Sequence, residues 1–135
     1  MAGTLTVSTL KNDTGVLATQ NGMTGICKAW AQWNGRSGAS PVIRGSFNIS
    51  SITRNATGDY TVAFTTAMPD VNYSVTGTGQ YTDAGTSGRG YFLSLYNSTS
   101  NPFTTNSVRV VGIQVDSGLG AYGDSTYITI IVCGN

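Results

Sequence analysis

The chain has 135 residues, of which 39% are hydrophobic and only 10% charged, and its seven basic and six acidic side chains leave a net charge of +1. No run of Lys or Arg is dense enough to displace counterions from a phosphate backbone, which argues against a nucleic-acid partner. No stretch approaches the roughly 18 apolar residues of a membrane span, and the N-terminus lacks the pattern of a secretion signal. We therefore expect synthesis in a cytoplasm, without membrane insertion.

The first 25 residues differ from the rest of the chain. Residues 3–10 alternate apolar and polar side chains as a short strand does, whereas residues 11–25 are rich in turn formers. We interpret residues 1–25 as an extended docking arm that adds to the sheet edge of a partner. A frayed terminus is the alternative. The expected docking residues are Leu5, Val7 and Leu10.

Residues 26–135 have the pattern of one β domain. Short runs of alternating apolar and polar residues are separated by glycine-rich breaks at the spacing typical of sandwiches and barrels. No segment shows the 3.6-residue period of an amphipathic helix. The sequence predicts an all-β fold: an antiparallel, jelly-roll-like β-sandwich with an extended N-terminal arm. The expected strands are residues 26–33, 42–49, 59–66, 71–77, 90–96, 107–115 and 126–133.

Three local features of this domain carry further predictions. Residues 55–58 form a hairpin loop in which Gly58 supplies a positive φ. The apolar residues of the strand 107–115 change face near Val110, Val111 and Gly112, which predicts a bulge there. The strand 126–133 is nearly all apolar, which predicts a central or interface strand.

Cys27 and Cys133 are the only two cysteines. Free, partly buried thiols fit synthesis in a reducing cytoplasm, whereas a disulfide formed after release would close nearly the whole chain. Metal binding would require more ligands than two thiols, and no histidine is present to activate a catalytic thiolate. The first two interpretations remain open.

The acidic residues predict neither catalysis nor a metal site. Glycoside hydrolysis requires two carboxyl groups with opposite protonation states, whereas almost every aspartate here lies beside a turn former and is expected to bond the backbone. A calcium loop between Asp116 and Asp124 would need alternate carboxylates and a terminal Glu, which are missing. We expect no enzyme activity and no cofactor. The acidic residues are Asp13, Asp59, Asp70, Asp83, Asp116 and Asp124.

Aromatic residues fall into an expected core set and an expected surface set. The core set is Trp30, Trp33, Phe47, Tyr60, Phe64, Tyr73, Phe92 and Phe103. The long breaks at residues 77–90, 97–106 and 116–125 are expected to form one outward face, where aromatic and polar side chains could contact a glycan or receptor. The alternative is that each tyrosine only packs over a neighbour. The expected contact residues are Tyr81, Asp83, Arg89, Tyr91, Tyr96, Asn97, Tyr122 and Asp124.

Three segments also carry a family resemblance, namely residues 29–35 (AWAQWNG), 43–52 (IRGSFNISSI) and 58–73 (GDYTVAFTTAMPDVNY). The block of residues 27–76 resembles a module of tail-fibre and related virion surface proteins of tailed bacteriophages, with weaker similarity over residues 3–7. The resemblance implies a structural protein located in the virion, a homotrimer, and docking to tail or capsid proteins. Family fibres carry a long shaft or anchoring domain before this module, whereas Met1 lies only 25 residues ahead of it here.

These observations predict a tail-fibre-like structural subunit displayed on the virion for host attachment, with a host-surface glycan as a possible partner. The missing shaft leaves a capsid decoration, cement or head-fibre protein as an alternative. A stand-alone carbohydrate-binding module is the second alternative.

Overall fold

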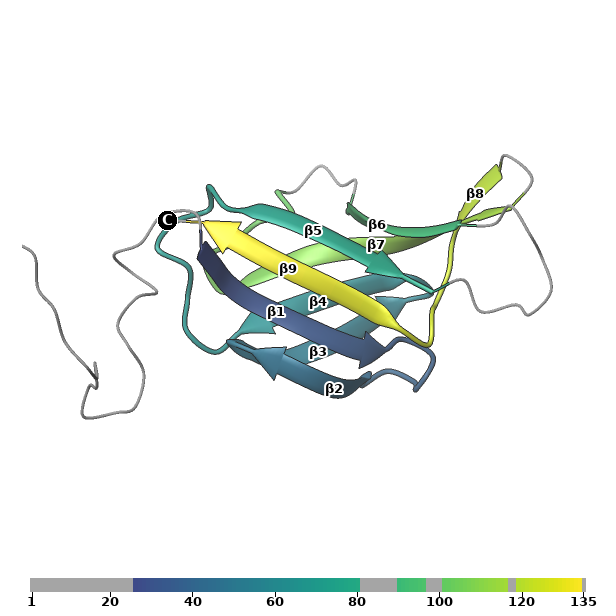
Figure 1. The fold of residues 1–135 in the computed structure, drawn as a ribbon, viewed down its shortest axis with the longest axis horizontal. Helices are drawn as coiled ribbons and strands as arrows, with labels where there is room; N and C mark the ends of the chain where they lie inside the picture. Colours follow the sequence, from purple (N-terminus) through teal and green to yellow (C-terminus); the bar gives the residue numbers. More distant parts are fainter. Residues whose placement is uncertain (1–25, 81–89, 97–100, 117–118, 135) are drawn as a thin grey trace, which may run out of the picture.

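The computed structural model of the chain describes residues 26–80, 90–96, 101–116 and 119–134. The predicted all-β, antiparallel fold is confirmed (Figure 1). The predicted arm, with Leu5, Val7 and Leu10, lies outside the described residues. In the described part no helix is long and apolar enough to cross a membrane. The strands are β1 (Ile26–Asn34), β2 (Val42–Phe47), β3 (Ile49–Ala56), β4 (Asp59–Phe64), β5 (Ser74–Gly79), β6 (Gly90–Leu95), β7 (Ser107–Asp116), β8 (Leu119–Tyr122) and β9 (Ile128–Gly134).

The strands form two facing halves of one folded sheet, in the order β2-β1-β9-β5-β6-β7-β4-β3, with β8 paired to β7. In Figure 1, β2, β1, β9 and β5 lie in front of the other half. One pairing, Thr78 with Phe92, joins the halves on one side. On the other side Asn48, with a φ of 56°, turns the chain from β2 into β3. Asn tolerates this left-handed conformation better than most residues. With the halves joined on both sides, the sandwich is nearly closed.

The side chain of Asn48 fixes that corner. Its amide oxygen accepts a hydrogen bond from the Thr66 backbone N–H at 2.7 Å, and its amide nitrogen donates to the carbonyl oxygens of Lys28 and Thr66 at 3.1 Å. Three backbone groups from two other segments are therefore satisfied by one side chain.

The core lies between the two halves, because every second residue of each strand points inward. Trp33 and Tyr60 meet there edge to face, with ring centroids 5.6 Å apart. The expected core is confirmed for Trp33, Tyr60, Phe64 and Tyr73, with Phe103 partly buried against it. The prediction is wrong for three aromatic residues that lie on outward faces, with exposed fractions of 39–45%: Trp30, Phe47 and Phe92.

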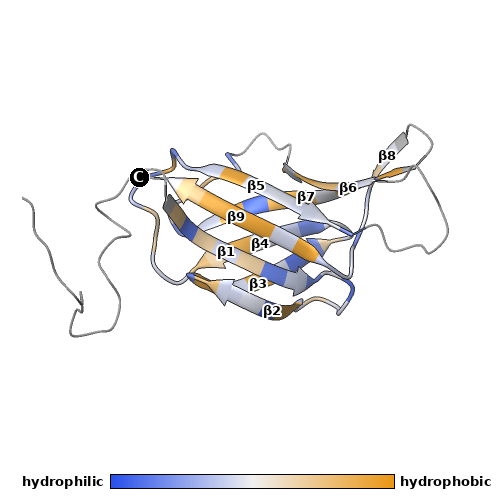
Figure 2. Ribbon diagram, viewed as in Figure 1, coloured by the Kyte–Doolittle hydropathy of each residue, from blue (hydrophilic) through white to orange (hydrophobic). Residues whose placement is uncertain are grey.

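Strand β9 is central, as its composition predicted. It pairs with β1 on one side and β5 on the other, and Figure 2 shows hydrophobic colour along most of its length. Ile128, Ile130 and Val132 are fully buried, while Ile131 points outward and is exposed. Strand β9 therefore has apolar residues on both of its faces, one face in the core and the other partly exposed.

The predicted bulge near Val110 and Val111 is absent. Strand β7 keeps an unbroken register with both β4 and β6 through these residues. Val110 belongs to the core, and Val111, directly opposite Asp59, is buried on the other face of the sheet. The apolar run therefore reflects burial of both faces rather than a change of register.

The predicted hairpin at residues 55–58 is confirmed as the turn between β3 and β4. Gly58 has a φ of 69°, and Arg54 pairs with Tyr60 just before the turn. Strands β3 and β8 were not among the expected strands. The register of β3 against β4 shifts twice, after Ile49 and after Arg54, which interrupts the alternation that identifies a strand.

Candidate ligand-binding site

A pocket of about 480 Å³ opens at the end of the sandwich that contains the β3–β4 turn. Three connections meet there: the β1–β2 turn, the β3–β4 turn and the link from β8 to β9. We call it the hairpin-end pocket. It is lined by Arg36, Gly38, Arg54, Thr57, Gln114, Tyr122, Gly123 and Asp124.

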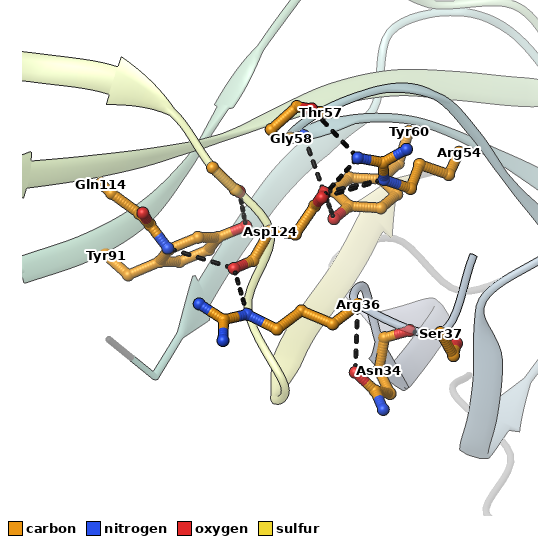
Figure 3. Close-up of polar contacts among 11 residues, drawn as sticks. Asn34, Arg36, Ser37, Arg54, Thr57, Gly58, Tyr60, Tyr91, Gln114 and Asp124 are labelled. Atoms are coloured by element: carbon orange, nitrogen blue, oxygen red, sulfur yellow. Dashed lines mark hydrogen bonds and ion pairs between the residues drawn. The ribbon is translucent and has the colours of Figure 1, made fainter. Parts of the chain in front are cut away.

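The carboxylate of Asp124 is the centre of the polar contacts at this pocket (Figure 3). Arg54 donates to it from Nε at 3.0 Å to each oxygen, and from its NH2 group at 2.5 Å. The Gly58 backbone N–H donates at 2.8 Å and the Tyr60 hydroxyl at 2.5 Å. One carboxylate therefore joins the β8–β9 link to both strands of the β3–β4 hairpin and to its turn.

The backbone around Asp124 is fastened as well. Its carbonyl oxygen accepts hydrogen bonds from Arg36 Nε at 3.2 Å and from Gln114 Nε2 at 3.1 Å. The Tyr91 hydroxyl donates to the neighbouring carbonyl oxygen of Gly123 at 3.1 Å. The link from β8 to β9 is thus held by β6, β7, the β3–β4 hairpin and the β1–β2 turn, which gives the pocket a rigid floor.

The protonation states of this cluster are fixed at neutral pH. Burial alone would raise the pKa of Asp124, but hydrogen bonds from Arg54, Tyr60 and the Gly58 N–H outweigh it and lower that pKa below its ordinary value. Burial, followed by the hydrogen bond to Asp124, raises the pKa of Tyr60 far above its ordinary value. Asp124 is therefore ionised and Tyr60 neutral, so the tyrosine always donates and the carboxylate always accepts.

Glycine permits the close backbone approach that builds the floor. The Gly112 N–H donates to the Gly58 carbonyl at 2.7 Å, and the Gly123 N–H donates to the Gly112 carbonyl at 3.0 Å. A Cβ on Gly58 would lie 2.6 Å from the Gly123 nitrogen and 2.8 Å from the Gly112 oxygen. These backbone segments could not pack so closely around a side chain at Gly58.

The rim of the pocket offers varied donors and one aromatic ring. Tyr122 is 51% exposed, and Thr57, Gln114 and Arg36 contribute a hydroxyl, an amide and a guanidinium. Hydroxyl and amide groups can exchange hydrogen bonds with polyhydroxylated ligands, and a tyrosine ring can cover the apolar face of a sugar. No group of three or more metal-binding acidic, cysteine or histidine side chains occurs among the described residues.

Of the expected contact residues that the structure describes, two line this pocket, Tyr122 and Asp124. Tyr91 is buried, with its hydroxyl bonded to Gly123, so its assignment to a ligand-contacting surface is wrong. Tyr96 lies elsewhere, with the guanidinium carbon of Arg109 3.7 Å from its ring centroid. The remaining expected contact residues, Tyr81, Asp83, Arg89 and Asn97, lie outside the described residues.

The expectation of one outward face from three long breaks is also corrected. Strand β6 begins beside the C-terminal end of β7, where Gly90 pairs with Val115. It ends near the middle of β7, where Leu95 pairs with Val110. Because β6 crosses the sandwich once, the breaks before and after it leave from opposite ends (Figure 1). The break at 97–106 therefore starts away from the hairpin-end pocket.

A second ion pair lies on the outer face of the β4–β7 pair. Arg109 donates to the Asp59 carboxylate from Nε at 2.9 Å and from its NH2 group at 2.5 Å, and Asn55 donates at 3.1 Å. These hydrogen bonds, above all those from Arg109, lower the pKa of Asp59 below its ordinary value. A pocket of about 220 Å³ borders the Arg109 and Tyr96 pair.

Four pocket residues with polar side chains were not identified from the sequence, and neither were two glycines: Arg36, Arg54, Thr57, Gln114, Gly38 and Gly123. Arg54 precedes the turn that the sequence did predict and Thr57 lies in it, so a polar pair at a hairpin end was a usable signal. The pairing of Arg54 with Asp124 joins residues 70 positions apart, and no local pattern contains it.

The chain matches no family model, no curated protein and no solved structure. The class that fold and site define is thus a nearly closed antiparallel β-sandwich with a polar pocket at one end.

Proposed function

We propose that the protein is a non-enzymatic, tail-fibre-like structural subunit of a bacteriophage virion that binds a host-surface saccharide in the hairpin-end pocket. The pocket, with its rigid floor and mixed polar and aromatic rim, is the observation that supports the binding role. The resemblance of residues 27–76 to phage surface proteins supports the location. The chain enters β1 and leaves β9 at the opposite end (Figure 1), so attachment there would leave the pocket facing outward.

A saccharide fits this pocket better than an apolar ligand. Its volume of about 480 Å³ lies within the usual range of small-ligand sites. The Arg54 guanidinium is held in place by Asp124 and by Thr57, whose hydroxyl accepts at 3.0 Å. Donors that are fixed before binding lose little conformational entropy when a ligand arrives. Sugar hydroxyls can use such donors while the ring stacks on Tyr122.

The described carboxylates with shifted pKa values support a binding rather than a catalytic role. A glycosidase keeps one carboxylic acid protonated by raising its pKa. Asp59 and Asp124 are instead held ionised by Arg109 and Arg54. Both act here as hydrogen-bond acceptors that organise the structure.

Replacing Tyr122 with alanine is expected to weaken saccharide binding about tenfold or more, because stacking and desolvation at an aromatic ring contribute on the order of 1–2 kcal/mol. Binding is measured on immobilised oligosaccharides from bacterial capsules and lipopolysaccharides. Tyr127→Ala is the matched control, since Tyr127 is also exposed (45%) but does not line the pocket. An absence of binding by the intact protein, or equal losses in both variants, would overturn the proposal.

A capsid decoration or cement protein is the second candidate. It is favoured by an apolar row on the outer face of the half formed by β2, β1, β9 and β5. Phe47, Trp30 and Ile131 lie side by side in register on β2, β1 and β9, each 39–41% exposed. An uncharged row of this kind suits contact with another protein subunit. Copy number in purified particles separates the two roles, because a decoration protein approaches the abundance of the major capsid protein and a fibre does not.

We propose that the same row joins three copies of the chain. Light scattering coupled to size exclusion is expected to give three times the 14.0 kDa chain mass. Ile131→Asp should lower that mass, because a carboxylate would lose its hydration in an apolar contact. Val71→Asp, at an exposed apolar residue outside the row (40% exposed), should leave it unchanged. A monomer at micromolar concentration would contradict the proposal.

A further inference from the structure

The two cysteines lie directly opposite each other in the sheet, although they stand near opposite ends of the described chain. Cys27 on β1 and Cys133 on β9 are register partners in the antiparallel pair. Opposed residues of such a pair have Cα atoms about 4.5–5.5 Å apart and side chains on the same face. Disulfides span Cα separations of about 4.4–6.8 Å. The backbone therefore already holds the two thiols at a separation that a disulfide can bridge.

A bulge in β1 creates this pairing. Ala29, Ala31 and Trp33 point into the core, so strict alternation would turn Cys27 inward as well. The register shifts between Cys27 and Ala29, which leaves Lys28 as the extra residue. As a result Cys27 is exposed, on the same side of the sheet as Cys133, which is half-buried.

The surroundings of Cys27 support the proximity of the two sulfur atoms. Its thiol donates to the Ala29 carbonyl at 3.3 Å and also contacts the backbone of Val132 on β9. Partial desolvation of the sulfur, followed by the neighbouring Cys133, raises the pKa of the Cys27 thiol. The Cys27 side chain therefore lies against β9 and within electrostatic range of its partner.

We propose that Cys27 and Cys133 form an intramolecular disulfide when the protein meets a small-molecule disulfide such as oxidised glutathione. The exposed Cys27 thiolate attacks one glutathione sulfur, forms a mixed disulfide and releases one glutathione thiolate. The Cys133 thiolate then attacks the Cys27 sulfur and releases the second glutathione. The protein loses two thiol protons and two electrons, and the glutathione disulfide is reduced to two thiols.

The expected consequence is a redox-dependent covalent link between the first and the last strand of the domain. The bond would join the start of β1 to the end of β9 and close a loop of roughly 100 residues. Restricting the unfolded chain to this extent predicts a melting temperature about 5–15 °C higher in the oxidised protein. The hairpin-end pocket lies at the other end of the sandwich, so the inference does not depend on the proposed function.

The test equilibrates the full chain with glutathione buffers of increasing oxidised fraction. In the oxidised protein, a thiol reagent added in denaturant is expected to detect neither cysteine. The intact mass should be lower by two hydrogen atoms, and the melting temperature should rise as given above. Cys27→Ser/Cys133→Ser is the control, and its melting temperature should not respond to the buffer. Two persistent glutathione adducts, chains linked to each other, or two free thiols in fully oxidised buffer would each overturn the proposal.

Discussion

Replacing Gly58 with alanine should destabilise the folded domain by about 2–5 kcal/mol. A left-handed backbone costs a non-glycine residue about 1–2 kcal/mol, and forced overpacking adds about 1–3 kcal/mol. Both costs apply here, because the φ of Gly58 is 69° and its new Cβ would meet the backbone of Gly123 at 2.6 Å and of Gly112 at 2.8 Å. Urea unfolding followed by tryptophan fluorescence measures the loss.

Gly38→Ala is the matched control for this prediction. Gly38 also has a positive φ, 101°, but a Cβ added there would have no atom within 4 Å. Only the backbone cost remains, so the expected loss is about 1–2 kcal/mol. Equal losses at both positions would show that the crowding around Gly58 contributes nothing.

Replacing Asp124 with alanine should cost about 2–4 kcal/mol of stability. The substitution removes the acceptor for the Tyr60 hydroxyl, which is buried, and the ionic partner of Arg54. Leaving a buried donor unsatisfied costs about 1–3 kcal/mol, and breaking a partly buried ion pair adds to that. Asp70→Ala is the control, because within the described part of the chain Asp70 accepts a single bond, from the exposed Asn72 N–H, and it should cost less than about 1 kcal/mol.

The pH dependence of stability distinguishes an ionic role of Asp124 from simple packing. Its folded pKa lies below its ordinary value, so the stabilisation is complete above the unfolded carboxyl pKa of about 3.9. It is lost as the pH falls through the folded pKa. The intact protein should therefore lose more stability between about pH 5 and pH 2 than the alanine variant does. Parallel curves would contradict the ionic role; the contribution of Asp59 is common to both proteins.

Alternation along the chain was enough to predict the all-β class and most strands, but not which face of a strand is buried. Trp30 and Trp33 both look like core residues, yet only Trp33 points between the halves. The two register shifts of β3 hid that strand, and the shift at Lys28 moved Cys27 to the outer face. A bulge inserts one residue without any composition that marks it, so a period-two pattern cannot place it.

The candidate site was less accessible to prediction than the fold. Asp124 was expected on a surface for ligand contact, but its carboxylate is largely occupied by Arg54, Tyr60 and Gly58. Turn aspartates do usually bond backbone groups, as Asp70 bonds Asn72 here. Asp124 differs from these aspartates because it bonds residues that are distant in the sequence, which converge at one end of the sandwich. That convergence depends on the strand order, which the residue pattern alone does not contain.

The corner at Asn48 also affects how copies of this domain can associate. Strands β2 and β3 are the two edge strands of the sheet, and the turn at Asn48 places the end of β2 next to the start of β3. Open sheet margins are where one chain adds a strand to another and starts aggregates. We expect the turn between the two edge strands to hinder the addition of further strands, which matters for a lightly charged protein at high local concentration. Assembly of this domain would then depend on side-chain faces such as the apolar row, which favours defined oligomers over open-ended fibrils.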